Sequence, residues 1–158
     1  MNRVRVIGCG NRDAGDDALG LIAVRSARER LPGTVEVIEA GTPARVIDLL
    51  ADVDAVVLVD AVRSAGAATD GGVIRLVAVG GGVFLGVRTS LSSHGLGLAE
   101  VLGLASAIGP LPRVVFLGLG ADQVAMGSGL SAPVAAGLPK LVDAVVAEAL
   151  ALTEASIP

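Results

Sequence analysis

Strand-like and helix-like segments alternate along the whole chain, and this alternation restricts the possible folds more than any other feature. Runs of β-branched and aliphatic residues predict five strands, at Val4–Gly8, Val35–Ile38, Ala55–Val59, Val73–Val79 and Arg113–Leu119. Helical spacing predicts a helix from Asp17 to about Arg30, a short helix that reaches Leu50, a helix from about Leu96 to Ile108, and one from Pro139 towards Thr153. The pattern is typical of an α/β fold, here a three-layer α/β/α sandwich with a mostly parallel five-stranded sheet.

Composition excludes several classes of protein. The 158 residues suit one domain spanning 1–158, and a hydrophobic share of 53% supplies its core. A net charge of −4, with two Phe and no Trp or Tyr, argues against a nucleic-acid partner, because such proteins need a basic face and stacking rings. One cysteine excludes an internal disulfide framework and a Cys-rich zinc site. No signal peptide and no long uninterrupted apolar span is evident, so we expect a cytoplasmic protein without membrane insertion.

Acidic and imidazole side chains follow three separate segments of the predicted fold. Asp16 and Asp17 come after the first strand and its loop, Asp60 ends the third strand, and His94 precedes a helix. The carboxyl ends of parallel strands meet at one edge of the sheet, where ligands bind. Two carboxylates and one imidazole suit a divalent ion such as nickel or zinc. The alternative is structural: an aspartate capping a helix, Asp60 binding nearby backbone amides, and a single histidine without a ligand.

The segment after the first strand resembles a dinucleotide-binding loop but departs from it. Gly8 and Gly10 follow a strand, yet Asp13 stands where the third glycine of that fingerprint belongs. Asp16 and Asp17 add negative charge that would repel a phosphate. The same charges would raise the pKa of the Cys9 thiol, so we expect a buried small side chain there and not a nucleophile.

The same segment resembles the opening signature of the hydrogenase maturation endopeptidases. It has the form G-x-G-N-x-x-x-x-D-D-x-x-G from Gly8 to Gly20. Three further stretches match that family in order, namely Glu39–Thr42 followed by Leu49 and Leu50, Val57–Ala61, and Ser92–Leu98. The resemblance covers nearly the whole chain.

This resemblance implies an endopeptidase that removes a C-terminal tail from the large-subunit precursor of nickel-iron hydrogenase. It implies that Asp17, Asp60 and His94 are both the metal ligands and the catalytic residues, with Asp16 in a capping or supporting role. The metal is nickel supplied by the precursor, with zinc or another divalent ion as a surrogate. Nickel would polarise the scissile carbonyl or activate a water while a carboxylate acts as base, or would serve recognition alone. Two alternatives stay open: a nickel- or zinc-binding module resembling a metallochaperone, and a nucleotide-binding regulatory domain.

Overall fold

The computed structural model describes residues 1–63, 72–78, 97–121 and 127–157. The predicted positions outside these ranges are Val79, at the end of a predicted strand, and residues 92–96 of the stretch Ser92–Leu98, which include His94 and the predicted helix start at Leu96. All statements on the fold concern the described residues.

The described strands form one sheet in the order β2-β1-β3-β5-β4. Their bounds are β1 Val4–Gly8, β2 Glu36–Glu39, β3 Ala55–Arg63, β4 Val73–Val77 and β5 Arg113–Ala121. The first three and β5 pair in parallel, and only β4, at one edge, runs antiparallel. The prediction of a mostly parallel five-stranded sheet is confirmed.

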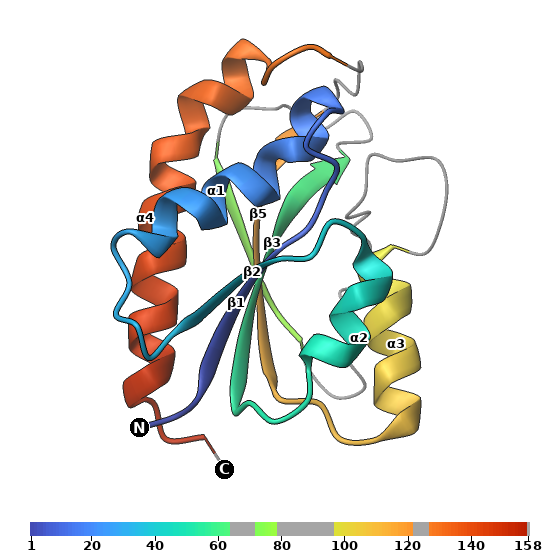
Figure 1. Ribbon diagram of the computed structural model, residues 1–158, viewed down its shortest axis with the longest axis vertical. Helices are drawn as coiled ribbons and strands as arrows, with labels where there is room; N and C mark the ends of the chain where they lie inside the picture. Colours follow the sequence, from blue (N-terminus) through green and yellow to red (C-terminus); the bar gives the residue numbers. More distant parts are fainter. Residues whose placement is uncertain (64–71, 79–96, 122–126, 158) are drawn as a thin grey trace.

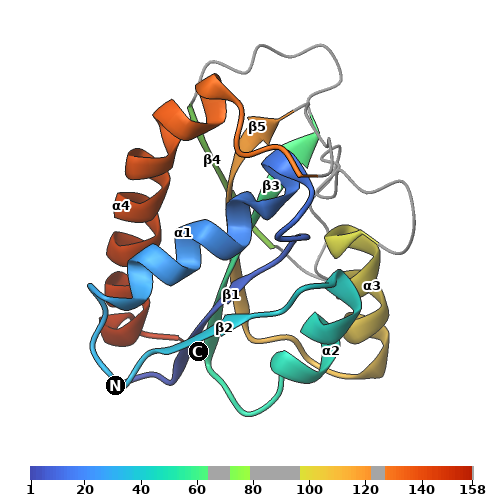
Figure 2. The ribbon, with the colours of Figure 1, turned by 45° about the horizontal axis from the view of Figure 1, so that its top comes forward.

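Helices cover both faces of this sheet (Figures 1 and 2). The α-helices are α1 Leu19–Arg28, α2 Val46–Leu49, α3 Leu98–Ile108 and α4 Ala132–Glu154, and two 3₁₀ turns, η1 Gly15–Ala18 and η2 Pro43–Arg45, precede α1 and α2. α1 and α4 lie on one face, and α2 and α3 lie on the other. The three-layer α/β/α sandwich is therefore confirmed.

The core has two halves because successive strand side chains point to opposite faces of the sheet. Val57 and Val59 pack with α1 and α4, whereas Leu58 packs with α2 and α3 beside Phe116. β3 lies in the middle of the sheet, so both of its faces are covered and its apolar run is continuous. Among the described helices, none has the length and apolar character needed to cross a membrane.

The prediction for the last helix was wrong at its beginning. The helical spacing predicts a start at Pro139, but α4 begins at Ala132 with Ser131 as its N-cap. Pro133 lies in the first turn, where a helix needs no backbone N–H, and Pro139 lies inside the helix on its exposed side. A proline inside a helical pattern therefore did not mark a boundary here.

Candidate active site

Glycines allow the first turn of α1 to lie directly on the end of β1 and on the middle of β3. A Cβ atom on Gly20 would come within 3.0 Å of the backbone carbonyl oxygens of both Cys9 and Val59. A Cβ atom on Gly8 would lie 2.5 Å from the carbonyl oxygen of Gly20 and 2.6 Å from Cγ2 of Val24. Only residues without a side chain fit this approach. It brings η1, which leads directly into α1, to the carboxyl edge of the sheet.

Asp17 lies in η1 and is held by the loop that follows β1. Gly10 and Gly15 have φ angles of +133° and +53°, in the region that favours glycine, so the loop can turn back on itself. The backbone N–H of Asn11 then donates to the backbone oxygen and to Oδ2 of Asp17, each at 3.2 Å. Asp17 is 3% exposed. The loop thus fixes this carboxylate in a largely buried position.

Asp60 lies within β3, which corrects the prediction that this residue ends the strand. β3 continues to Arg63 because β5 keeps pairing with it up to Ala121. On the other side, pairing with β1 stops at Val59, so Asp60 is the first residue of β3 beyond the end of β1. The predicted position at the sheet's carboxyl edge therefore holds with respect to β1.

The side chain of Asp60 is buried on the face covered by α2 and α3, the same face as the side chains of Leu58 and Val62. Its Oδ1 accepts a hydrogen bond from the backbone N–H of Ala61 at 2.8 Å. Its β5 partner is Gly118, where a Cβ atom would come within 3.0 Å of the Asp60 carbonyl oxygen. The bond to Ala61 is of the kind that the structural alternative predicted, but it engages only Oδ1.

The charges of Asp17 and Asp60 act on each other. Burial raises the pKa of the Asp60 carboxyl well above its usual range, the negative charge of Asp17 raises it further, and the bond from Ala61 opposes both. Burial also raises the pKa of the Cys9 thiol, with further contributions from Asp60 and then Asp17. The expected burial of Cys9 is confirmed, and burial contributes more to the raised pKa of its thiol than the two aspartates do.

Asp17 and Asp60, two of the three predicted site residues, lie on η1 and β3, which contact each other, and the charge of Asp17 acts on Asp60; the third, His94, lies outside the described residues. Within the described part of the chain, no group of three His, Cys, Asp or Glu side chains is arranged to hold a metal ion. Two carboxylates and an imidazole would complete such a group in a form suited to a divalent cation of nickel or zinc type. α3 follows His94 in the sequence. Its first turn is the part of this helix that lies nearer the carboxyl edge of the parallel sheet (Figure 1).

Asp16 does not join this pair. Its carboxylate is 1% exposed and accepts hydrogen bonds from the backbone N–H and the hydroxyl of Ser131, at 2.6 and 2.8 Å. The predicted capping or supporting role for Asp16 matches this geometry. Ser131 was missed as the partner of Asp16, because the two residues are distant in the sequence. The glycines at positions 20 and 118 were also missed, because a close backbone approach leaves no local sequence pattern.

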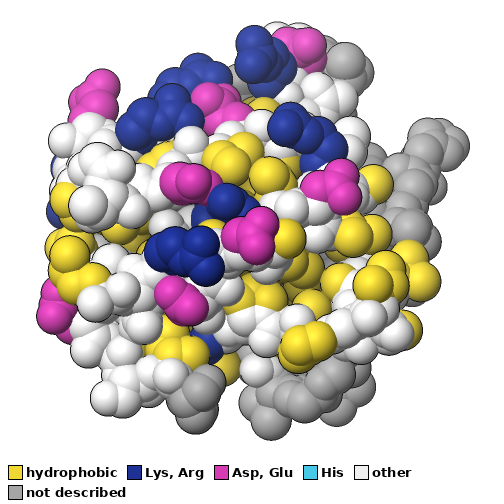
Figure 3. Space-filling model, turned by 60° about the horizontal axis from the view of Figure 1, so that its bottom comes forward, with side chains coloured by type: hydrophobic (Ala, Val, Ile, Leu, Met, Phe, Trp, Pro, Cys, Tyr) yellow, Lys and Arg dark blue, Asp and Glu magenta, His cyan; other side chains and the backbone are white. Residues whose placement is uncertain are grey.

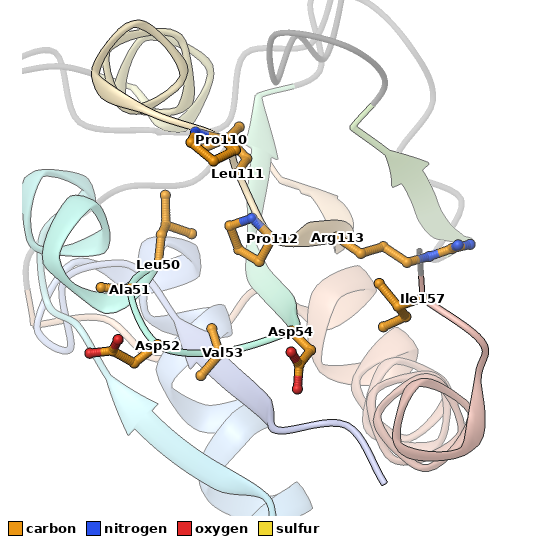
Figure 4. Close-up of a pocket in the computed structure, with 10 residues that line it drawn as sticks. All are labelled: Leu50, Ala51, Asp52, Val53, Asp54, Pro110, Leu111, Pro112, Arg113 and Ile157. Atoms are coloured by element: carbon orange, nitrogen blue, oxygen red, sulfur yellow. The ribbon is translucent and has the colours of Figure 1, made fainter.

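A cavity of about 560 Å³ lies at the opposite edge of the sheet, around the loops that enter β3 and β5 (Figure 4). It is lined by Leu50–Asp54, Pro110–Arg113 and Ile157. Asp54 in this lining accepts a hydrogen bond from the backbone N–H of Arg3 at 2.7 Å, so it ties the loop to β1. Figure 3 shows acidic and basic side chains interspersed over this end of the molecule. The cavity is separate from the carboxylate pair.

The fold and the two buried carboxylates define an α/β protein that places its polar residues at the carboxyl edge of a parallel sheet. Comparison with protein families matches residues 22–148 to the HycI family, described as hydrogenase maturation protease. The chain belongs to the hydrogenase maturation protease family. Asp60 and His94 lie inside the matched region, and Asp17 precedes it.

Solved structures agree over almost the full length. The hydrogenase maturating endopeptidase HybD from Escherichia coli is 26% identical, with a TM-score of 0.78 over 96% of this chain and 94% of that one. The [NiFe] hydrogenase maturation protease HybD from Thermococcus kodakarensis is 25% identical, with a TM-score of 0.71 over 93% and 99%. A hydrogenase 2 maturation peptidase from a Thaumarchaeota archaeon is 28% identical, with a TM-score of 0.66 over 95% and 99%. Curated protein sequences gave no match.

Proposed function

We propose that this protein is an endopeptidase that removes the C-terminal extension of a nickel-iron hydrogenase large-subunit precursor after nickel has been inserted. Membership of the hydrogenase maturation protease family supports the class of reaction. The observation that carries the site assignment is the buried pair Asp17 and Asp60, brought together from η1 and β3. On the basis of the same family membership, we also propose that the protein acts in the cytoplasm.

In this proposal the nickel arrives with the substrate. Two buried carboxylates that repel each other form a site that favours a divalent cation, since the cation offsets both the burial and the repulsion. Asp17 and Asp60 would bind the precursor's nickel together with His94, and zinc or another divalent ion would be a surrogate. Metal held there would fix the precursor's tail against the carboxyl edge of the sheet, so that the scissile bond is presented only when nickel is present.

The rigid surroundings of the pair support a role in positioning. Gly8 and Gly20 hold η1 close to β1 and β3, and Gly118 brings β5 close to the backbone of Asp60. Both carboxylates therefore lie on backbone that is fixed on several sides. A site on such elements holds its ligand more precisely than a site on loops alone.

Alanine variants test the site assignment. Asp17→Ala, Asp60→Ala and His94→Ala should each abolish removal of the tail from a nickel-loaded precursor, as read by intact mass. Asp143→Ala is the matched acidic control, because Asp143 lies exposed on α4 and pairs only at the surface with Arg30. Circular dichroism would establish that each variant is folded. Normal processing by all three site variants would contradict the assignment.

A metallochaperone-like module remains the competing function, and the same experiment separates the two. A module of that kind would hold nickel on its own and leave the precursor uncut. Wild-type protein that binds nickel by calorimetry but cleaves no loaded precursor would favour it.

A further inference from the structure

Asp16 and Asp17 are adjacent in the sequence, yet their carboxylates serve different neighbours. The charge of Asp17 acts on Asp60, whereas both oxygens of Asp16 accept hydrogen bonds from Ser131, a residue of a distant segment. Oδ1 accepts from the Ser131 backbone N–H at 2.6 Å, and Oδ2 accepts from the Ser131 hydroxyl at 2.8 Å. The contact spans 115 residues of sequence and is partly buried, with Asp16 itself 1% exposed.

Ser131 gives up its usual role to make this contact. A serine at the N-cap of a helix ordinarily uses its hydroxyl to accept a hydrogen bond from the first turn. In α4 no such side-chain bond forms, and only the Ser131 carbonyl accepts from the helix, at 2.9 Å from the Ala135 nitrogen. The hydroxyl donates to Asp16 instead. The negative charge of Asp16 also lies at the positive end of a 23-residue helix, which stabilises it.

A second contact joins the same two segments. The backbone N–H of Gly127 donates to the backbone oxygen of Asp13 at 2.8 Å. Segment 127–131 therefore holds the turn around residues 13–17 at two points. α4 itself is anchored in the core through Val134 and Leu141, so it provides a fixed support.

We propose that Asp16 is a positioning residue, which fixes η1 against the start of α4 and thereby sets the place of the Asp17 carboxylate relative to Asp60. The inference rests on the proposed function, in which Asp17 binds the substrate's nickel. η1 has only four residues, so a shift at Asp16 is passed directly to Asp17. A displacement of about 1 Å in a positioning group can cost on the order of 100-fold in rate.

Three variants separate positioning from a direct chemical role. Asp16→Asn keeps an oxygen that accepts from the Ser131 N–H and gains an amide that donates to the Ser131 oxygen, while the charge is lost. Asp16→Ala removes both hydrogen bonds with Ser131. Ser131→Ala removes only the hydroxyl bond and retains the N–H, so it remains informative should Asp16→Ala fail to fold. Val142→Ala, in the buried part of α4, is a control for lost stability alone.

The readout is kcat and KM for tail removal from nickel-loaded precursor, measured well below the unfolding temperature of each variant. Asp16→Ala should lower kcat by about 10- to 100-fold with KM nearly unchanged, Ser131→Ala should lower it by about 3- to 10-fold, and Asp16→Asn should stay within about 3-fold of wild type. Val142→Ala should leave kcat unchanged.

The opposite results overturn the inference. If Asp16→Asn is as slow as Asp16→Ala, the charge of Asp16 itself takes part in the reaction. If Asp16→Ala and Ser131→Ala both match wild type, the contact with α4 does not position Asp17. A comparable loss in Val142→Ala would reduce the effect to stability. Failure of the wild type to process the precursor would instead overturn the proposed function, so the two failures are distinguishable.

Discussion

Replacing Gly20 with alanine tests whether the close approach of α1 to the sheet places Asp17. The new Cβ atom would come within 3.0 Å of two backbone oxygens, those of Cys9 and Val59, where ordinary contact begins at 3.4 Å. Neither oxygen belongs to a flexible side chain, so the backbones of α1 and of the strands must separate by about 1 Å to restore ordinary contact. Overpacking of this kind costs about 1–3 kcal/mol. The free energy of unfolding should fall by that amount, although alanine is the better helix former.

The matched control is Gly103→Ala in α3. A Cβ atom at Gly103 would meet nothing within 4 Å, so alanine should raise the free energy of unfolding by about 0.5–1 kcal/mol through its helix preference. Urea denaturation of both variants gives the comparison, and the two changes should have opposite signs. Because Asp17 lies three residues before Gly20, Gly20→Ala should also lower kcat for tail removal by about tenfold or more. A Gly20→Ala variant as stable and as active as Gly103→Ala would refute the reasoning.

Three further changes have defined outcomes. The pKa of Asp60 is raised in the folded protein, so its ionisation lowers the free energy of unfolding as pH rises from the unfolded pKa near 4 through the folded pKa. In urea titrations, Asp60→Asn should therefore be more stable than wild type by about 0.5–2 kcal/mol at pH 7, and this gain should shrink towards pH 4. The variant should also lose processing. Cys9→Ala should retain processing, and native wild type should resist iodoacetamide at pH 7, because the thiol is buried and its pKa is raised; rapid modification of the folded protein would contradict this. Pro139→Ala should raise the thermal unfolding temperature without changing kcat, because the proline is exposed and has no N–H to donate to the Ala135 carbonyl. A lower unfolding temperature would show that the proline is needed.

The layers of the fold were predictable because they depend on local patterns. The continuous apolar run at Ala55–Val59 identified a strand buried on both faces, and the first glycine-rich turn identified the carboxyl edge of the sheet. The length of β3 was not predictable from its own residues. It depends on how far β5 continues to pair with it, which is a contact between segments distant in the sequence.

The candidate site was likewise predictable in its residue types but not in its contacts between distant segments. The residue types pointed to Asp17 and Asp60, and the structure brings them together. Which member of the Asp16–Asp17 pair faces Asp60 was indicated only by the family resemblance. In the structure the different roles of Asp16 and Asp17 depend on Ser131, whose hydroxyl donates to Asp16 and does not cap α4. A serine before a helix has the same sequence pattern whether it caps that helix or binds another segment.

The most direct test of the central claim compares one precursor in three states: loaded with nickel, free of metal, and loaded with zinc. Wild-type protein would be incubated with each, and removal of the C-terminal extension would be followed by intact mass, with Asp17→Ala and Asp60→Ala in parallel. Wild type should cleave the nickel-loaded precursor and, because zinc is the proposed surrogate, also the zinc-loaded one, and it should leave the metal-free precursor intact. Neither variant should cleave the precursor in any of the three states. Equal cleavage of loaded and metal-free precursor by wild type would contradict a site that acts by binding the substrate's nickel.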